Sequence, residues 1–308
     1  MTDATPYRLD RDVVAYHCGR DLPPRLTVAP GSIVTVATHD ARSGRLKQPE
    51  DVIPTAPDFD APGYPKTNPV TGPIAVEGAE PGDALAVTIL DIDLDPQGFI
   101  IARPEWGVVQ NSVPHQVARM LPVRDGAVEF APGIRIPLRP NVGTIGTAPA
   151  GDGVATIHCG RHGGNMDSNA IRPGTTVHLP VNVAQGLLFV GDVHAVMSDS
   201  EAVGTGCEIG ARVTLRVDLV KGAARDWPWM ETDTQIISYG AAPVYEDAAE
   251  IAMDQMIDMV ATRHDLSPAE AFMLIGLAGD MRINQSCRSP IDISMRVEFP
   301  KQLDGLAR

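Results

Sequence analysis

The chain has 308 residues and a formal net charge of −14, with 44% hydrophobic and 21% charged residues. This composition predicts a folded core without a long charged tail. The negative net charge argues against a basic surface of the kind that binds the phosphates of nucleic acids, so we expect no nucleic-acid partner. It also argues against an anionic membrane surface as a partner.

Targeting and cysteine patterns point to the cytoplasm. No apolar run approaches the about 20 residues that span a bilayer, and no basic and apolar leader of the secretory type is visible at the start. The four cysteines lie far apart and show no CxxC spacing, which predicts neither a zinc ribbon nor a disulfide framework. They are Cys18, Cys159, Cys207 and Cys287.

Short β-branched runs, bounded by glycine and proline, dominate the first two-thirds of the chain. In chain order, they predict strands at residues 32–38, 84–90, 175–181, 187–190 and 211–219. The last of these shows the clearest alternation of apolar and polar residues, which is typical of a strand with one buried face.

The last third of the chain changes character. Residues 246–264 repeat apolar positions at helical spacing. Residues 267–270, Ser-Pro-Ala-Glu, form a capping box that begins a second helix, which continues to Leu277. Because this helix is nearly all apolar, we expect it to be buried. An alternating strand is predicted at residues 291–299.

These elements predict a mainly β fold, a β-rich α+β chain whose late helical pair packs on the sheets. No linker is long enough to separate two domains. We therefore expect a single domain over residues 1–308, β-rich over 1–240, with the helical pair and last strand over 241–308.

Imidazoles, an amide and carboxylates are concentrated around glycines in two segments. The first runs from Ile157 to Asp167, and the second begins at Gly191 and includes Asp192, His194, Asp199, Glu201 and Glu208. Histidine with aspartate or glutamate is the ligand set of a hard or borderline divalent metal. Glycine lets the backbone approach a ligand closely. The pattern therefore predicts a metal-assisted hydrolytic site.

Several collinear motifs resemble the acetamidase/formamidase family. The two polar segments above carry the resemblance, in the strings 162–167 (His-Gly-Gly-Asn-Met-Asp) and 191–195 (Gly-Asp-Val-His-Ala). Further matching segments lie at residues 38–41, 68–74, 141–149 and 277–285. Together they span roughly residues 25 to 300, and their common order makes the resemblance specific.

The resemblance implies a mainly β enzyme with late helices, a homodimer or higher homo-oligomer that hydrolyses a small carboxamide with a divalent metal. One departure concerns the segment after His194, where Ser198 and Ser200 stand in place of two glycines of the family. The acids of this segment are retained, so a metal site can survive, whereas the substrate preference is put in question.

Amide hydrolysis needs an activated water, a polarised carbonyl and an acid for the leaving amine. We assign the metal to Asp40, Asp167 and His194, with Glu201 as a fourth ligand. Zinc is the expected metal and calcium the alternative.

The remaining roles go to other residues of the polar segments. Glu208 is the expected general base or a further ligand, while Asn165 and His162 are expected to bind the substrate carbonyl or the oxyanion. Asp40 also fits a simple turn. Asp192 and Asp199 are interpreted as solvated loop acids, and Asp280, Arg282 and Gln285 as a structural network beneath the site.

Three alternatives stay open. The first is a hydrolase of the same scaffold that acts on a larger amide or a cyclic imide. The second is a non-catalytic, metal-binding β-rich oligomer. The third is a thiol-dependent amidase that uses Cys159, although no Cys-His-acid arrangement of known spacing is present.

Overall fold

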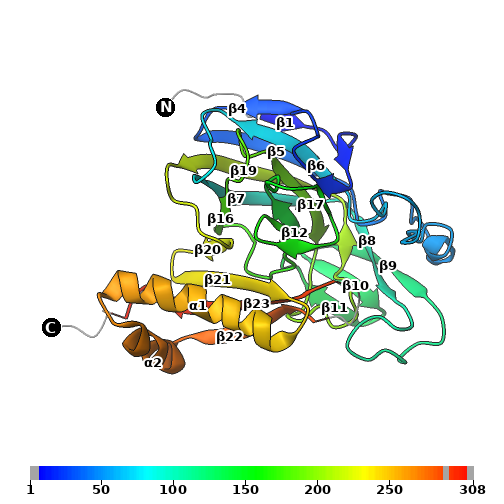
Figure 1. Ribbon diagram of the computed structural model, residues 1–308. Helices are drawn as coiled ribbons and strands as arrows, with labels where there is room; N and C mark the ends of the chain where they lie inside the picture. Colours follow the sequence, from blue (N-terminus) through cyan, green and yellow to red (C-terminus); the bar gives the residue numbers. More distant parts are fainter. Residues whose placement is uncertain (1–6, 287–290, 304–308) are drawn as a thin grey trace.

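The computed structural model describes residues 7–286 and 291–303. It is mainly β with two late helices, so the predicted fold class is confirmed (Figure 1). Most predicted strands keep their place, and the strand expected at 187–190 continues to His194. This extension matters because it puts Asp192 and His194 on a strand and not in a loop.

Nine described strands form the first sheet. In spatial order they are β1 (Tyr7–Leu9), β5 (Ser32–Thr38), β19 (Ala211–Val220), β7 (Ala84–Leu94), β16 (Thr176–Pro180), β20 (Trp229–Glu231), β21 (Gln235–Ala242), β23 (Ile293–Pro300) and β22 (Asp280–Gln285). Apart from the parallel pair β1–β5, neighbouring strands in this order are antiparallel.

The second sheet holds the polar segments. Its main path is β11 (Ile134–Pro137), β10 (Ala127–Ala131), β9 (Val117–Arg124), β8 (Gln97–Ala102), β18 (Glu208–Ile209), β17 (Leu188–His194), β12 (Asn141–Gly146), β15 (Gly163–Asn165) and β14 (Cys159–Gly160). Off this path, β6 (Val70–Val76) pairs with β17, β2 (Val14–Ala15) and β4 (Leu26–Val28). A separate pair joins β3 (His17–Cys18) to β13 (Val154–Ala155).

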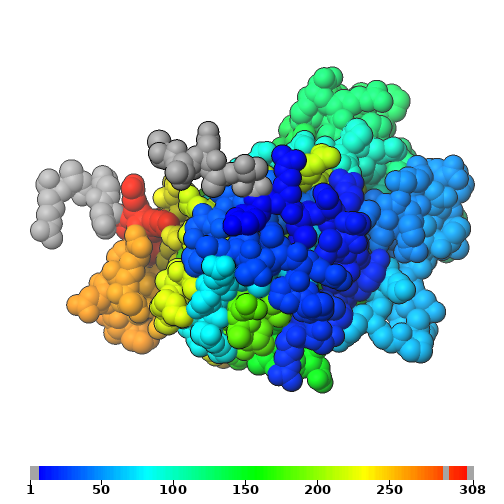
Figure 2. Space-filling view, turned by 90° about the horizontal axis from the view of Figure 1, so that it is seen from above, coloured from blue at the N-terminus to red at the C-terminus, as the bar shows by residue number. Residues whose placement is uncertain are grey.

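The main core lies between the two sheets. It combines apolar side chains of β5, β7 and β19 with those of β12 and β17, among them Val36, Val213 and Val190. Figure 2 shows the N-terminal part of the chain, in blue, spread across one face of the molecule, with the orange segment that forms the helices at one end. Burial between stacked sheets is the main source of stability for such a fold.

The helices cover the end of the first sheet. Helix α1 (Tyr245–His264) packs on β21 and β23, and α2 (Pro268–Ala278) packs on α1 (Figure 1). The predicted capping box is confirmed, since Glu270 N donates to Ser267 Oγ and Ser267 N donates to Glu270 Oε2. Neither helix of the described ranges has the length and apolar character needed to cross a membrane.

The predicted burial of α2 is wrong. Only Ala271 and Ile275 of this helix are buried, whereas Met273 is 63% and Leu277 87% exposed. The physical reason is that, within residues 7–286 and 291–303, α2 packs mainly on α1 and on β23, so its other apolar face stays open.

Candidate metal and catalytic site

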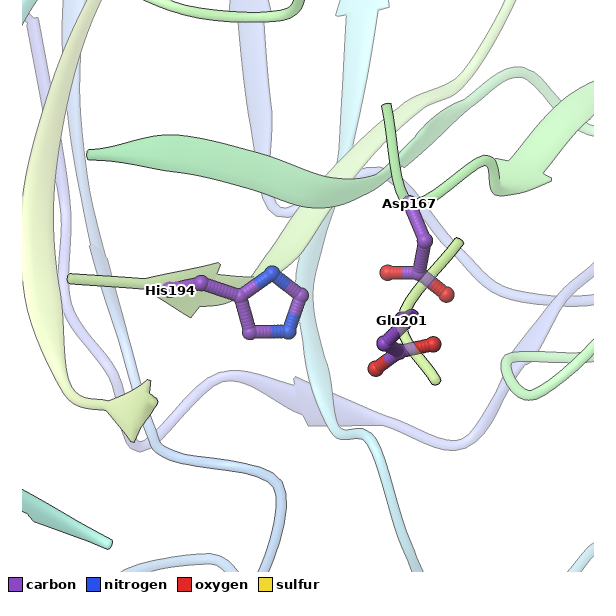
Figure 3. A group of neighbouring side chains, drawn as sticks. All are labelled: Asp167, His194 and Glu201. Carbon is purple, nitrogen blue, oxygen red and sulfur yellow. The ribbon is translucent and has the colours of Figure 1, made fainter. Parts of the chain in front are cut away.

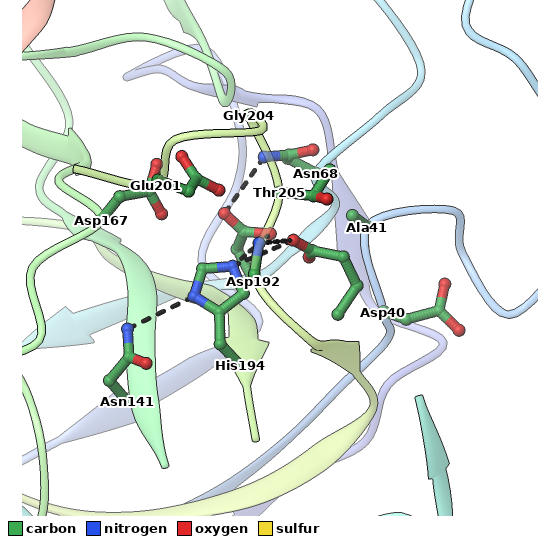
Figure 4. Close-up of polar contacts among 12 residues, drawn as sticks. Asp40, Ala41, Asn68, Asn141, Asp167, Asp192, His194, Glu201, Gly204 and Thr205 are labelled. Carbon is green, nitrogen blue, oxygen red and sulfur yellow. Dashed lines mark hydrogen bonds and ion pairs between the residues drawn. The ribbon is translucent and has the colours of Figure 1, made fainter. Parts of the chain in front are cut away.

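The polar side chains converge where β12, β15, β17 and β18 meet (Figure 4). Asp192 and His194 stand on β17, and Glu208 stands on β18 directly opposite His194. Asp167 follows β15, and Glu201 lies in the loop between β17 and β18. All five side chains are at most 4% exposed.

Two groups of three side chains share His194. In the first, Asp167, His194 and Glu201 place one ligand atom each within 4.8 Å of one another (Figure 3). In the second, Asp192, His194 and Glu208 do the same. His194 Nε2 lies 3.2 Å from Glu208 Oε1 and 4.0 Å from Asp192 Oδ1.

Two buried amides hold the first group. Asn165 Nδ2 donates to Asp167 Oδ2 at 2.7 Å. Gln285 Nε2, at the end of β22, donates to Asp167 Oδ2 at 2.6 Å and to Glu201 Oε2 at 2.8 Å. The chain that returns from the helices thus orients two of the carboxylates.

Asp192 is held from the other side. Its Oδ2 accepts from Asn68 Nδ2 at 3.1 Å and from Thr144 Oγ1 at 3.2 Å. Thr144 Oγ1 also lies 2.8 Å from Asn165 Oδ1, and Asn68 Nδ2 lies 3.4 Å from the same atom. Both amide ends of Asn165 therefore engage neighbouring side chains.

The backbone of the site is strained. Asp167, Asp192 and Glu201 have φ values of 43°, 55° and 42°, and Asn68 has 46°. Non-glycine residues rarely adopt this left-handed region, and such strain is concentrated at functional sites. Four of the residues that converge here therefore share a costly conformation that the surrounding hydrogen bonds maintain.

Gly143 makes room for the convergence. A Cβ at this position on β12 would lie 2.6 Å from Asp167 Oδ1 and 2.8 Å from His194 Cε1. The side chains of the first group thus approach the bare backbone of β12 more closely than any other residue type would allow.

Burial raises the pKa of all four carboxyl groups. The pKa of Asp192 rises to about 7, and the neighbouring Glu208 carboxylate adds to the rise. Burial raises the pKa of Glu201 to about 8 and that of Glu208 to about 7. The pKa of Asp167 lies well above its usual range, first through burial and then through the repulsion of Glu201.

The donor set fits a divalent cation. Asp167 Oδ1, Asp192 Oδ1 and Glu208 Oε2 are buried and receive no hydrogen bond from the residues that the structure describes. Four clustered carboxylates repel one another in a low dielectric, and a cation would relieve that cost. Imidazole together with carboxylate favours zinc over calcium, which prefers oxygen ligands alone.

A cavity opens onto these carboxylates. It is partly open to solvent, and its wall includes Asp167, Glu201 and Glu208. Asn68, Asn165 and Gln285 line it as well. A small molecule in this cavity would therefore meet the acidic cluster directly.

Of the four predicted metal ligands, the structure brings Asp167, His194 and Glu201 together and leaves Asp40 apart. The Asp40 carboxylate accepts the backbone N–H groups of Arg42 and Gly44, each at 2.9 Å. Figure 4 shows its side chain directed away from His194.

The predicted substrate-binding residues differ in position. Asn165 lines the cavity, whereas His162, in the turn between β14 and β15, is not among the lining residues. Burial lowers the pKa of His162 to about 4, so its ring is neutral at pH 7.

The interpretation of Asp192 as a solvated loop acid is wrong. Its side chain is 1% exposed because β17 runs further than its apolar pattern indicated. Asp199, in contrast, is partly exposed and pairs with Arg296 at 3.0 Å.

The buried thiols are not activated. Burial raises the pKa of Cys159 and of Cys207 to about 12, which keeps both protonated at neutral pH. Cys287 lies outside the described residues.

Sequence reasoning missed the roles of several polar residues, although the quoted motifs contain them. Asn68 begins the 68–74 segment, and Asn141 and Thr144 belong to 141–149. Gln285, in contrast, was expected in a network beneath the site, and its side chain donates to Asp167 and Glu201. A conspicuous amide at the edge of a glycine- and proline-rich motif was the available signal. The side chain that each of these residues contacts, however, lies in another segment of the chain, so the sequence alone does not reveal the contact.

Comparison with known proteins gives one consistent result. The family model described as Acetamidase/Formamidase family matches residues 12–152 and 150–250. The crystal structure of an acetamidase from Bacillus halodurans is 35% identical, with a TM-score of 0.89 over 95% of this chain and 97% of that chain. A predicted acetamidase/formamidase from Thermoanaerobacter tengcongensis is 31% identical, with a TM-score of 0.89 over 96% of this chain and 95% of that one.

A curated relative is more distant. The acetamidase of Mycolicibacterium smegmatis is 27% identical over 266 residues, which cover 66% of this chain. The match spans 64% of the length of that relative.

Proposed function

Because this chain belongs to the acetamidase/formamidase family, we propose that it is a metal-dependent amidase that hydrolyses a small carboxamide, such as formamide or acetamide, to the carboxylate and ammonia. The observation that carries the proposal is the buried cluster of one imidazole and four carboxylates, three of which line a cavity. Amide hydrolysis needs such groups because both the carbonyl and the amine leaving group are unreactive.

In this proposal, Asp167, His194 and Glu201 hold the metal, and zinc is the expected ion. When bound, a divalent ion lowers the pKa of a water and polarises a carbonyl oxygen. Asn165 and Gln285 orient the ligand carboxylates through the hydrogen bonds described above. Asn165 thereby has a positioning role, and because it also lines the cavity, the substrate contact that the sequence predicts stays a prediction.

Glu208 acts as the proton carrier. It lines the cavity, and its Oε2 receives no hydrogen bond from the described residues. A carboxylate in this position would take a proton from the attacking water and return it to the departing nitrogen. The backbone N–H of Gly206 donates to its other oxygen, Oε1, at 2.9 Å and fixes its orientation.

The proposal includes self-association and a cytoplasmic location. The open apolar face of α2, with Phe272 54%, Met273 63% and Leu277 87% exposed, supports a homo-oligomer. The free, buried thiols of Cys18, Cys159 and Cys207 agree with a reducing compartment.

The first experiment measures ammonia release from formamide, acetamide and propionamide by the purified protein. We expect activity to disappear on chelation and to return with Zn²⁺. Asp167→Asn and His194→Ala should each lower kcat/KM by at least about 100-fold, the upper end of the cost of disturbing a metal ligand's support. His115→Ala and Asp152→Asn, at exposed positions, are the matched controls and should retain activity.

Other outcomes would redirect the proposal. Activity that survives complete metal removal contradicts metal dependence. A protein that binds metal but releases no ammonia from any amide fits the non-catalytic, metal-binding oligomer. Turnover restricted to larger amides or cyclic imides favours the same-scaffold alternative.

A further inference from the structure

A buried guanidinium lines the cavity beside the acidic cluster. Arg42 follows β5 and is 5% exposed, yet it forms part of the same wall as Glu208. Its guanidinium makes one hydrogen bond to the described residues, from Nη1 to the backbone oxygen of Thr55 at 3.0 Å. None of the described carboxylates lies within 4.0 Å of it.

Such an arrangement costs free energy unless something compensates for the charge. A buried ion normally has a close partner of opposite sign, and an arginine presents five donors in a planar fork. Burial lowers the pKa of Arg42 to about 10, so the group is still charged at pH 7. Apart from the bond of Nη1, its donors have no hydrogen-bond partner among the described residues, so they are available to a ligand in the cavity.

The turn that presents Arg42 is well fixed. The Asp40 carboxylate accepts the N–H of Arg42 and that of Gly44. Thr55, the partner of the guanidinium, is itself buried and donates its hydroxyl to Asp51 O at 2.7 Å. A fixed guanidinium is pre-organised for one binding geometry.

The outer wall of the cavity adds a second guanidinium and two aromatic rings. Arg103 Cζ lies 3.2 Å from the centroid of the Trp106 ring and 5.6 Å from that of Phe59. Trp106 packs so closely on Gly204 that a Cβ there would lie 1.8 Å from its Nε1. The cavity thus adds the guanidinium of Arg42 and aromatic side chains to the acids, which is more than formamide or acetamide would need.

We propose that the substrate is a small carboxamide that carries a carboxylate at its other end, and that Arg42 binds this carboxylate. The inference rests on the proposed amidase function. A guanidinium and a carboxylate match in shape and charge and form paired hydrogen bonds. Binding of the carboxylate at Arg42 would direct the amide toward Glu208 and the proposed metal ligands.

The reaction is an ordinary hydrolysis. Water adds its oxygen to the amide carbon, the C–N bond breaks, and the nitrogen leaves as ammonia with the proton carried by Glu208. The monoamide of a dicarboxylic acid therefore gives the dicarboxylate and ammonium, and no further reactant is required.

The test compares succinamate with succinamide, which differ in charge but hardly in shape, on the metal-loaded protein. We expect kcat/KM to be at least about tenfold higher for succinamate. The reason is that the loss of one charged partner from a buried ion pair lowers affinity by about tenfold or more. Malonamate and glutaramate, with their neutral diamides, establish the best chain length.

Variants then locate the effect. Arg42→Gln should abolish the preference for succinamate, Arg42→Lys should retain part of it, and both proteins should be checked for folding by circular dichroism. Lys47→Gln removes a cation from the same loop outside this cavity and should leave the preference intact. The wild-type protein supplies a measurement that needs no variant, since succinate should inhibit acetamide hydrolysis competitively and raise the Tm.

The inference is overturned if succinamate and succinamide react equally well in the wild type, or if succinate neither inhibits nor stabilises. It is also overturned if Arg42→Gln lowers turnover of both substrates by the same factor, because Arg42 would then stabilise the carboxylates of the site or the transition state and would not bind the substrate carboxylate. In these cases hydrolysis of neutral amides continues, whereas failure of the proposed function would appear as no ammonia from any amide.

Discussion

At the scale of single residues, the site combines buried charge with strained backbone. Asp167, Asp192 and Glu201 adopt a conformation that non-glycine residues rarely take, and burial raises the pKa of each carboxyl group. Neither feature stabilises a fold, and both are typical of sites where function opposes stability. The residues of this cluster are therefore those where we expect substitution to change chemistry first.

Asn141 contacts the imidazole of His194. Its Nδ2 lies 3.3 Å from His194 Nδ1, and its Oδ1 receives no hydrogen bond from the described part of the chain. An imidazole that binds a cation through Nε2 carries its hydrogen on Nδ1. A half-turn of the Asn141 amide supplies the acceptor for that N–H.

We expect Asn141→Leu to weaken zinc binding by about 10- to 100-fold, because the ligand loses the partner that orients it. Asn141→Asp keeps an acceptor and should bind zinc nearly as well as the wild type. Competition with a chromophoric chelator measures both affinities. Equal zinc affinity of the leucine variant and the wild type would contradict this role.

At the scale of elements, the pairing of β12 with β15 and β17 brings the ligands together. Gly143 lies in the middle of β12, and the backbone N–H groups of Met166 and Asp167 both donate to its oxygen. β12 thus anchors the backbone of Asp167. Because Gly143 has no side chain, there is space beside it for the side chains of both Asp167 and His194.

Gly143→Ala is expected to destabilise the protein by about 1–3 kcal/mol, the usual cost of overpacking, and to lower zinc affinity. The reason is the 2.6 Å approach of the new Cβ to Asp167 Oδ1. Gly151→Ala is the matched control, since a Cβ there meets nothing within 4 Å. Urea denaturation and chelator competition give the two quantities. If Gly143→Ala had the stability and the zinc affinity of the wild type, β12 would be able to shift and make room for the added methyl group, which would contradict the prediction.

At the scale of the whole molecule, the acidic cluster links metal binding to stability. Folding raises the pKa of Asp192 from 3.8 to about 7, that of Glu201 from 4.5 to about 8 and that of Glu208 from 4.5 to about 7. The metal-free native state therefore holds protons that the unfolded chain has released. Its stability is complete below the unfolded pKa values and is lost as the pH rises through the folded ones.

We therefore expect the Tm of the chelated protein to fall between about pH 5 and pH 8, with each carboxyl costing up to about 1.4 kcal/mol per pH unit within its range. A bound cation removes the repulsion, so the difference in Tm between loaded and chelated protein should widen as the pH rises. Thermal unfolding at three pH values measures this. Glu201→Gln, which cannot ionise, should flatten the dependence. A metal-free Tm that rises with pH would contradict the account.

The sequence by itself determined the local elements and much of the chemistry. Alternation marked β19, the capping box marked the start of α2, and the motif order indicated the family. Such features depend on neighbours a few residues apart, so they can be read along the chain. The placement of Asp167, His194 and Glu201 as candidate ligands also came from the sequence, because they lie in glycine-rich polar segments.

Only the tertiary structure decided which distant side chains join them. Asp192 entered the cluster because β17 is longer than its apolar run, and Gln285 because β22 returns from the helices to the site. Arg42 reached the cavity through a turn far from the other residues in sequence. The exposed face of α2 likewise depends on what packs against it. Periodicity and motifs describe one segment at a time, whereas burial and convergence depend on strand order and packing between segments.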